Sequence, residues 1–202
     1  MIKNIVFDIG NVLLQFKPKE YFAALFQDSN FSESVCDLMM TSDVWKKYDL
    51  GVLGLDDVKH EFQRLYPQYH ERIEEMLDHW VQILEPLDYT MEKMLMLKRK
   101  GYGVYLLSNL NKEAYDYIKK RYHIFQDCDG YVVSFQEKLA KPDPEIYHCL
   151  CNRYQILPEE SVFLDDCLEN VQAAISCGFF GIHFNDECKV EEQLEALLHE
   201  QK

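Results

Sequence analysis

The sequence predicts an α/β protein with a doubly wound parallel sheet and an inserted α-helical cap subdomain. Three observations support this fold class. Short runs of β-branched and aromatic residues alternate with helically periodic segments in the second half of the chain. About seventy residues near the N-terminus show helical periodicity alone. The 202 residues are 48% hydrophobic and 28% charged, so one domain with a substantial core is expected.

Five segments are expected to form buried strands because they are rich in β-branched and aromatic residues and are bounded by turn signals. They are residues 4–7, 102–107, 131–134, 161–164 and 179–184. Helical periodicity lies before and between the later strands, at residues 91–100, 111–123, 144–154 and 168–177. This alternation is what parallel crossover units require.

Helix boundary signals agree with this order of elements. Asp143 followed by Pro144 is typical of an N-cap with proline at the first helical position. Gly101 and Gly178 stand where a C-terminal glycine would end the preceding helices. These signals predict where three of the core helices begin or end.

Residues 16–88 form a separate helical block. The segment is far longer than a crossover needs, contains no convincing strand, and has amphipathic stretches at 21–27, 56–66 and 71–84. We therefore expect an α/β core formed by residues 1–15 and 89–202, with residues 16–88 inserted after the first strand as the helical cap.

The charge excludes several classes of partner. Lys and Arg number 21 against 35 Asp and Glu, and 21 − 35 gives a net charge of −14, which disfavours nucleic acid and membranes. No apolar run approaches the ~20 residues that span a bilayer, and the N-terminus does not resemble a signal peptide. We expect a cytoplasmic monomer or weak homodimer that acts on a small molecule, with its seven cysteines as free thiols.

Polar residues follow several of the predicted strands. In an open parallel sheet, ligands bind beyond the carboxyl ends of the strands. The candidates there are Asp8, Ser108, Asn109, Lys141, Asp165 and Asp166. If the strands are neighbours, three carboxylates, a hydroxyl, an amide and an ammonium group converge.

Three converging carboxylates repel one another unless a cation lies among them. Oxygen ligands without a His or Cys cluster suit Mg²⁺, which also coordinates phosphate oxygens. Lys141 and Ser108 would then donate to a bound phosphate, together with backbone N–H groups at the start of the helix after Asn109.

Four segments resemble the motifs of the haloacid dehalogenase-like hydrolase superfamily. They are FDIGNVLL, LLSN, LAKPDPEIY and FLDD, in the family's order and spacing, and the match covers almost the whole chain. The resemblance implies a Rossmann-like core with a helical cap of the first class. The GNV after Asp8 and the WKKYDLG beginning at Trp45 resemble most the small bacterial phosphatases that include α-D-glucose-1-phosphate phosphatase.

The resemblance implies a role for each motif. Asp8 would be the nucleophile that forms an aspartyl-phosphate. Ser108 and Asn109 would hold the phosphoryl group, and Lys141 would neutralise its charge. The ligands of Mg²⁺ would be Asp8, Asp166 and the carbonyl of Gly10, with Asp165 close by. The implied activity is Mg²⁺-dependent hydrolysis of a small phosphorylated metabolite, a sugar phosphate by this resemblance.

Gly10 departs from the family pattern, because phosphatases of the superfamily usually carry an acidic residue there that protonates the leaving group. Three explanations are open: the substrate is a sugar 1-phosphate whose leaving group needs little protonation, another residue supplies the proton, or turnover is lost. The resemblance places a substrate loop at residues 45–51, with Trp45, Tyr48 and Asp49 as candidate contacts. Tyr48 or Asp49 would supply the proton in the second case.

Two other functions compete with a phosphatase. A hydrolytic 2-haloacid dehalogenase also uses a nucleophilic Asp without a second acid, but it needs no Mg²⁺, so the adjacent Asp165 and Asp166 argue against it. A non-catalytic phosphometabolite-binding module would use the same residues without turnover. Metal dependence separates the first from a phosphatase, and phosphate release separates the second.

Overall fold

The computed structural model describes residues 1–185 and 187–199, and it contains a five-stranded parallel sheet in the order β5-β4-β1-β6-β7. The strands are β1 (Asn4–Phe7), β4 (Gly103–Ser108), β5 (Gly130–Val133), β6 (Ser161–Asp165) and β7 (Phe180–His183). All five predicted strands are present, with ends shifted by no more than one residue. Because β1 lies between β4 and β6, its carboxyl end adjoins the ends of both neighbours.

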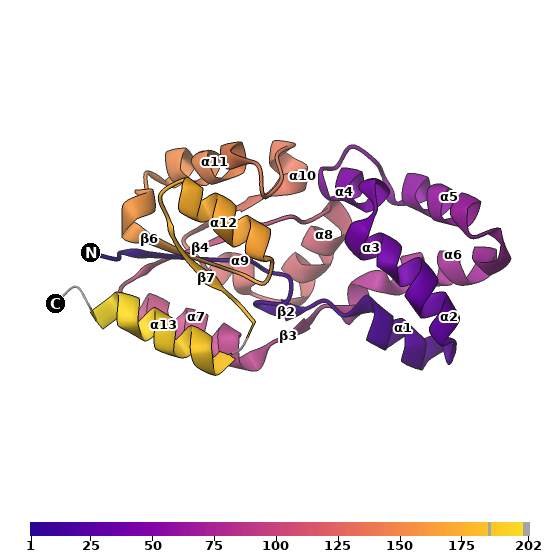
Figure 1. Cartoon of the computed structure of the whole chain (residues 1–202), viewed down its shortest axis with the longest axis horizontal. Helices are drawn as coiled ribbons and strands as arrows, with labels where there is room; N and C mark the ends of the chain where they lie inside the picture. Colours follow the sequence, from indigo (N-terminus) through magenta and orange to yellow (C-terminus); the bar gives the residue numbers. More distant parts are fainter. Residues whose placement is uncertain (186, 200–202) are drawn as a thin grey trace.

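Helices cover both faces of this sheet, as in a doubly wound fold (Figure 1). One face packs against α11 (Pro144–Tyr154) and α12 (Leu168–Ser176), and the other against α7 (Asp88–Arg99) and α13 (Glu187–His199). Every residue of β1 is buried, which is expected for a central strand covered on both sides. The remaining core helices are α8 (Lys112–Arg121), α9 (Ile124–Asp127) and α10 (Ser134–Glu137).

The predicted helix boundaries are confirmed. The carboxylate of Asp143 accepts the backbone N–H of Glu145 at 3.0 Å, and α11 begins at Pro144. Gly101 and Gly178 follow the ends of α7 and α12 with φ of +91° and +96°. These backbone angles fall in the region that glycine adopts without a Cβ penalty.

The segment between β2 (Leu14–Gln15) and β3 (Glu85–Pro86) is almost entirely helical. Helices over the three predicted stretches are joined by further short ones that lacked clear periodicity in the sequence. In chain order they are α1 (Pro18–Phe26), α2 (Ser29–Phe31), the π-helix η1 (Ser32–Cys36), α3 (Asp37–Thr41), α4 (Asp43–Asp49), α5 (Leu55–Leu65), the 3₁₀ helix η2 (Pro67–Tyr69), α6 (His70–His79) and the 3₁₀ helix η3 (Trp80–Ile83).

The expectation that residues 16–88 contain no strand is wrong for β3. This two-residue strand pairs antiparallel with β2, so that Leu14 lies opposite Pro86. Its shortness and its proline conceal it in the sequence. The β2–β3 ribbon joins the two points where the chain leaves and re-enters the core (Figure 1).

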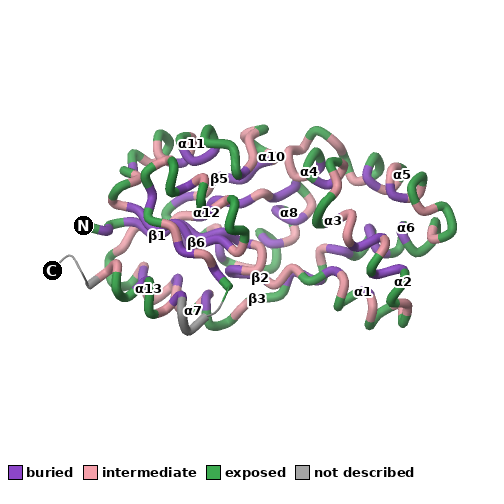
Figure 2. Tube along the Cα trace, in the orientation of Figure 1, coloured by how far each residue is buried: buried purple, intermediate pink, exposed green. Residues whose placement is uncertain are grey.

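The apolar interior of the helical block is continuous with the hydrophobic cluster of the sheet. Purple segments, which mark buried residues, run through the sheet and also between the helices of the block (Figure 2). Phe22, Phe31, Phe62 and Ile73 are fully buried there. The N-terminus lies at the end of the core that is remote from this block (Figure 1). Among the described residues, no helix has the length and apolarity needed to span a bilayer.

Candidate active site

Three carboxylates meet at the carboxyl end of the central strands. Asp8 directly follows β1, Asp165 is the last residue of β6, and Asp166 is the next residue. One oxygen of each lies within 4.8 Å of the others. Because β1 and β6 are hydrogen-bonded neighbours with Phe7 opposite Leu164, their ends bring these acids together without any special loop.

Lys141 is the cation within this cluster. Its Nζ lies 2.8 Å from Oδ1 of Asp8 and 2.6 Å from Oδ2 of Asp165, and it donates to the carbonyl of Leu107 at 3.0 Å. The residue is only 5% exposed. Burial alone would lower the pKa of Lys141, but the carboxylates of Asp165 and Asp8 raise it above its usual value. The ammonium group therefore stays charged and offsets part of the negative charge.

The adjacent acids Asp165 and Asp166 are used differently. Both oxygens of Asp165 are occupied, because Oδ1 accepts the N–H of Cys167 at 2.8 Å and the amide of Asn170 at 3.1 Å, while Oδ2 faces Lys141. Asp166 accepts one hydrogen bond at Oδ2, from the amide of Asn11 at 2.9 Å. Asp166 therefore keeps an oxygen available for a ligand, and Asp165 does not.

Two carboxylates of this cluster, Asp8 and Asp166, have a pKa above the ordinary value. Burial raises the pKa of Asp8 to about 7, Lys141 opposes the shift, and the charges of Asp165 and Asp166 add to it. Burial also raises the pKa of Asp166. A site that holds this much negative charge with one ammonium group fits a divalent cation with oxygen ligands.

Asn11 is a site residue that sequence reasoning missed. It has φ of +52°, a conformation that asparagine tolerates better than most residues. Its Nδ2 donates to Asp166, and its Oδ1 accepts the N–H of Phe16 at 2.9 Å. The side chain thus links the turn after β1 to Asp166. The Gly-Asn pair, which begins three residues after the end of β1, was the available signal.

The two polar residues that end β4 have different roles in the structure. Ser108 is buried and lines the cavity beside Asp8. The side chain of Asn109 is fully engaged with the backbone of Lys141, because Oδ1 accepts its N–H at 2.8 Å and Nδ2 donates to its carbonyl at 2.9 Å. Asn109 also lines the cavity, so its expected contact with a phosphoryl group stays a prediction, and its side chain in addition positions Lys141.

Gly10 lies at the cavity beside the acidic cluster. A Cβ built there would meet nothing within 4 Å, so space is not the reason for glycine at this position. Asp8 and Asp166 line the same cavity. The carbonyl of Gly10 is therefore a candidate third oxygen ligand for a cation that these two carboxylates would hold.

The helical block contributes Trp45 and Asp49 to the same cavity. They are four residues apart on α4, so they share one face of the helix. Tyr48 does not share that face, and it is not among the described residues that line the cavity. Its ring packs against two tryptophans, with centroid distances of 5.2 Å to Trp45 and 6.3 Å to Trp80. Tyr48, expected to contact the substrate, is therefore part of the supporting core.

Asp49 is held at the cavity by groups of the α/β core. Its Oδ1 accepts the amide of Asn111 at 2.9 Å, and its carbonyl accepts the hydroxyl of Ser134. Burial raises the pKa of Asp49 to about 7, Asn111 opposes this shift, and the charge of Asp8 adds to it. Asn111 was expected only as part of a helix and had no predicted role at the site.

The cavity between the core and the helical block has a volume of about 280 Å³. Its core side carries the acidic cluster, Lys141 and Ser108. The wall formed by the helical block is mostly apolar, with Phe16, Met40, Trp45, Trp80 and Leu84, and Leu110 of the core adds another apolar side chain to the lining. The arrangement can bind a cation and an anion at one end and an organic group at the other.

Comparisons with known proteins agree with this geometry. The family model for haloacid dehalogenase-like hydrolases matches residues 2–178. The sesquiterpene phosphatase astK of Aspergillus oryzae is 26% identical over 97% of this chain and 96% of its own length. The D-ribitol-5-phosphate phosphatase of Bacteroides thetaiotaomicron is 26% identical over 89% of this chain and 90% of its own length.

Solved structures show the same fold. A hydrolase from Porphyromonas gingivalis, described as a predicted member of this family, has a TM-score of 0.74 with 21% identity, and the match covers 100% of both chains. Relatives in sequence also include (S)-2-haloacid dehalogenases.

Proposed function

The chain belongs to the haloacid dehalogenase-like hydrolases, and we propose that it is a Mg²⁺-dependent phosphatase that forms a phosphorylated Asp8. The observation that carries this proposal is the group of three carboxylates around one buried lysine. Asp8, Asp165 and Asp166 lie within 4.8 Å of one another, and Lys141 contacts two of them. Two phosphatases are among the relatives that match nearly the whole chain.

Asp8 is the nucleophile in this proposal. A carboxylate oxygen attacks phosphorus, the bond from phosphorus to the leaving oxygen breaks, and the leaving oxygen takes up a proton. Water then attacks the same phosphorus, which releases inorganic phosphate and restores the carboxylate. Lys141, 2.8 Å from Asp8, orients the nucleophile and offsets the charge of the incoming phosphate.

Phosphate binding falls to the residues that follow β4. The hydroxyl of Ser108 lines the cavity next to Asp8, and backbone N–H groups at the start of α8 lie on the same side. Asn109 contributes indirectly, because both polar atoms of its side chain hold the backbone of Lys141.

The donor set fits Mg²⁺. Asp8, Asp166 and the carbonyl of Gly10 would hold the ion, whereas both oxygens of Asp165 are already hydrogen-bonded. Burial is the main cause of the raised pKa of Asp8, and the charges of Asp165 and Asp166 add to it; a divalent cation would neutralise that negative charge. When bound, Mg²⁺ supplies positive charge for the phosphate oxygens.

The cavity wall favours an ester whose organic group presents apolar surface. A sugar placed against Trp45, Trp80 and Met40 would bury hydroxyls with few partners, at about 1–3 kcal/mol for each unsatisfied group. The name of the astK relative, a sesquiterpene phosphatase, points to the same substrate class. The sugar phosphate expected from the sequence, including a sugar 1-phosphate, stays a prediction that a direct comparison tests.

Dehalogenation is the second candidate, because dehalogenases share the fold and the nucleophile. The carboxylate cluster argues against it, since dehalogenation needs no cation there. An activity that survives removal of the metal by a chelator would reverse this preference.

The test is a screen for phosphate release by pure protein with Mg²⁺ and with excess EDTA. The substrates are p-nitrophenyl phosphate, a sesquiterpenyl monophosphate, glucose 1-phosphate, glucose 6-phosphate and ribitol 5-phosphate. We expect phosphate release that EDTA abolishes. Among the alkyl and sugar esters, the sesquiterpenyl monophosphate should have the highest kcat/KM. No release from any substrate would favour a binding module without turnover.

A further inference from the structure

Breaking the ester bond of an alkyl phosphate needs a proton source, because an alkoxide is a poor leaving group. Five titratable side chains line the described part of the cavity: Asp8, Asp49, Lys141, Asp166 and Cys167. Asp8, Asp166 and Lys141 belong to the charged cluster that binds the phosphate and the cation. Asp49 and Cys167 remain as candidates.

Asp49 enters the cavity from the helical block, opposite the strand ends that carry Asp8. An ester whose phosphate contacts Asp8 directs its leaving oxygen away from the strand ends and toward this wall, because the nucleophile and the leaving group occupy opposite sides of phosphorus. Cys167 directly follows Asp166 in the chain and therefore lies on the strand side of the cavity. The position of Asp49 is thus the better one for contact with the leaving oxygen.

Asn111 fixes which oxygen of Asp49 is available. Asn111 is the N-cap of α8, and its Oδ1 accepts the N–H of Ala114 at 3.0 Å. Its amide must therefore present NH₂, not oxygen, to Asp49, and it donates to Oδ1 at 2.9 Å. Within the described residues, Oδ2 of Asp49 has no hydrogen-bond partner. A proton on Asp49 is accordingly placed on Oδ2.

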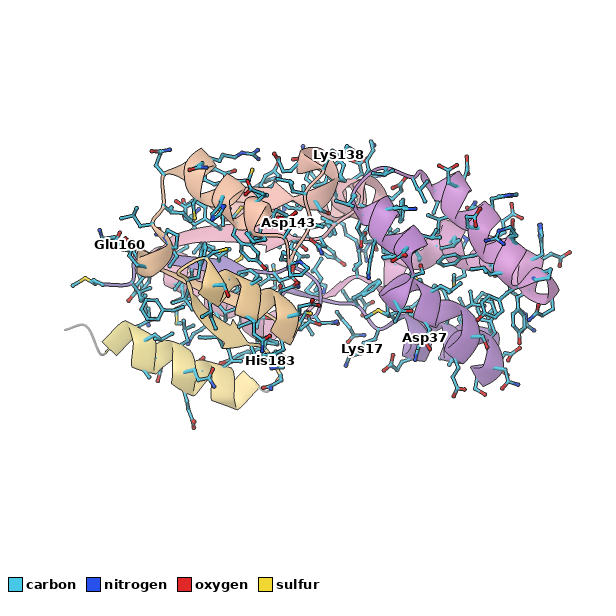
Figure 3. All side chains as sticks on the ribbon, turned by 45° about the horizontal axis from the view of Figure 1, so that its top comes forward. Lys17, Asp37, Lys138, Asp143, Glu160 and His183 are labelled. Atoms are coloured by element: carbon cyan, nitrogen blue, oxygen red, sulfur yellow. The ribbon has the colours of Figure 1, made fainter. Side chains whose placement is uncertain are left out.

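The backbone around Asp49 is tied to the α/β core at two further points. Ser134 donates its hydroxyl to the carbonyl of Asp49, and Lys138 donates to the carbonyl of Gly51 at 2.6 Å. Figure 3 shows Lys138 at the junction between the core and the helical block. These bonds hold the end of α4 against the core, so Asp49 is a fixed part of the site.

We propose that Asp49 is a catalytic residue that donates a proton to the leaving oxygen and then takes one from the attacking water. The inference rests on the proposed phosphatase function. As the bond from phosphorus breaks, its electron pair stays on the leaving oxygen, which takes the proton from Oδ2. In the second step the Asp49 carboxylate takes a proton from water as the water oxygen attacks phosphorus, so that each cycle restores the protonated acid.

The electrostatic surroundings of Asp49 agree with this role. Burial and the charge of Asp8 raise the pKa of Asp49 to about 7, so that it holds a proton near neutral pH. Other charged groups on the neighbouring elements include Lys112 and Glu113 of α8 and Lys138 next to α10. No other described titratable group of the helical block lines the cavity.

The test compares two esters of similar size and apolarity, p-nitrophenyl phosphate and p-nitrobenzyl phosphate, in the wild-type protein and the Asp49→Asn variant. The phenolate leaves without help, whereas the benzyl alkoxide needs a proton. We expect kcat/KM to fall about 10²–10⁴-fold for the benzyl ester and less than about tenfold for the phenyl ester. Asp56→Asn, an exposed change in α5, is the matched control and should alter neither.

Equal losses for the two esters, or no loss, would overturn the inference. The Asn111→Ser variant provides an independent measurement, because serine keeps the N-cap of α8 but removes the amide that orients Asp49. In this variant kcat/KM should fall less than in Asp49→Asn, and the fall should again be larger for the benzyl ester than for the phenyl ester. Equal falls for the two esters would contradict the inference. Lack of phosphate release by the wild-type protein from either ester would refute the proposed function, and this inference with it.

Discussion

The side chain of Asn109 brackets the peptide of Lys141: Oδ1 accepts the Lys141 N–H at 2.8 Å, and Nδ2 donates to the Lys141 carbonyl at 2.9 Å. This pair of bonds connects the end of β4 to the loop that carries the buried ammonium group. Asn109 is therefore a positioning residue for Lys141, and we expect phosphate binding to depend mainly on Ser108 and on backbone N–H groups.

Replacing Asn109 with Ala should lower kcat more than it weakens binding of inorganic phosphate. Lys141 would lose its orientation, and two backbone groups would lose partners, at about 1–3 kcal/mol of stability. Steady-state kinetics with inorganic phosphate as a competitive inhibitor measures both effects. A large loss of phosphate affinity with unchanged kcat would show that the Asn109 side chain binds phosphate, as the sequence led us to expect.

Replacing Lys141 with Met should abolish activity and lower the free energy of unfolding by about 3–5 kcal/mol, because Asp8 and Asp165 would remain buried without their cation. The matched control is Lys120→Met on the exposed face of α8. Urea unfolding of the variants without Mg²⁺ gives the comparison. If Lys141→Met lowers the free energy of unfolding no more than Lys120→Met does, Lys141 does not hold the cluster together.

Mg²⁺ should raise the Tm of the wild-type protein and leave the Tm of the Asp8→Asn and Asp166→Asn variants nearly unchanged, because a ligand that binds the folded state stabilises it. Without Mg²⁺, Asp8→Asn should be at least as stable as wild type, since burial disfavours the charged form of Asp8. Thermal melts with and without Mg²⁺ test both statements. Equal stabilisation of all three proteins would place the cation elsewhere.

Asp49 should make stability depend on pH. The pKa of Asp49 is raised from 3.8 to about 7 by burial, so the folded protein binds this proton more tightly than the unfolded chain does. Its contribution is full below pH ~4 and is lost as the pH rises to about 7. The Asp49→Asn variant does not lose stability in this way. The difference between its Tm and that of wild type should therefore increase by at least ~2–4 °C between pH ~4 and about 7. A constant difference would contradict the shift.

Met40 should influence which leaving group is preferred. It lines the apolar wall yet is 49% exposed, so a polar residue there should be tolerated by the fold. We expect Met40→Gln to lower kcat/KM for an apolar ester several-fold relative to glucose 6-phosphate, because it removes apolar contact area. Competition between the two substrates measures the ratio. An unchanged ratio would mean that the apolar wall does not contact the organic group.

The core of the site could be predicted because strand order and strand ends determine it. Asp8 and Asp165 need only neighbouring parallel strands in order to meet, and patterns of residue type reveal such strands. The Mg²⁺ ligands and the role of Asp8 rest on the family resemblance, and they stay proposals that the variants above test.

Other features depend on side-chain directions that no pattern in one sequence reveals. Trp45 and Tyr48 are three residues apart, yet Trp45 lines the cavity and Tyr48 packs behind it. The amide of Asn109 could have contacted phosphate or backbone, and only the position of the Lys141 loop decides between them. Asn111 is predicted from the sequence only as part of a helix, and its contact with Asp49 requires the folded helical block.

The most direct test of the central claim is mass spectrometry of protein quenched with acid during turnover of p-nitrophenyl phosphate. Peptides that contain residue 8 should carry the added mass of one phosphoryl group on Asp8, which disappears when substrate is exhausted and is absent from the Asp8→Asn variant. Steady phosphate release with no phosphorylated Asp8 at any quench time, or a phosphoryl group on another residue, would contradict the account.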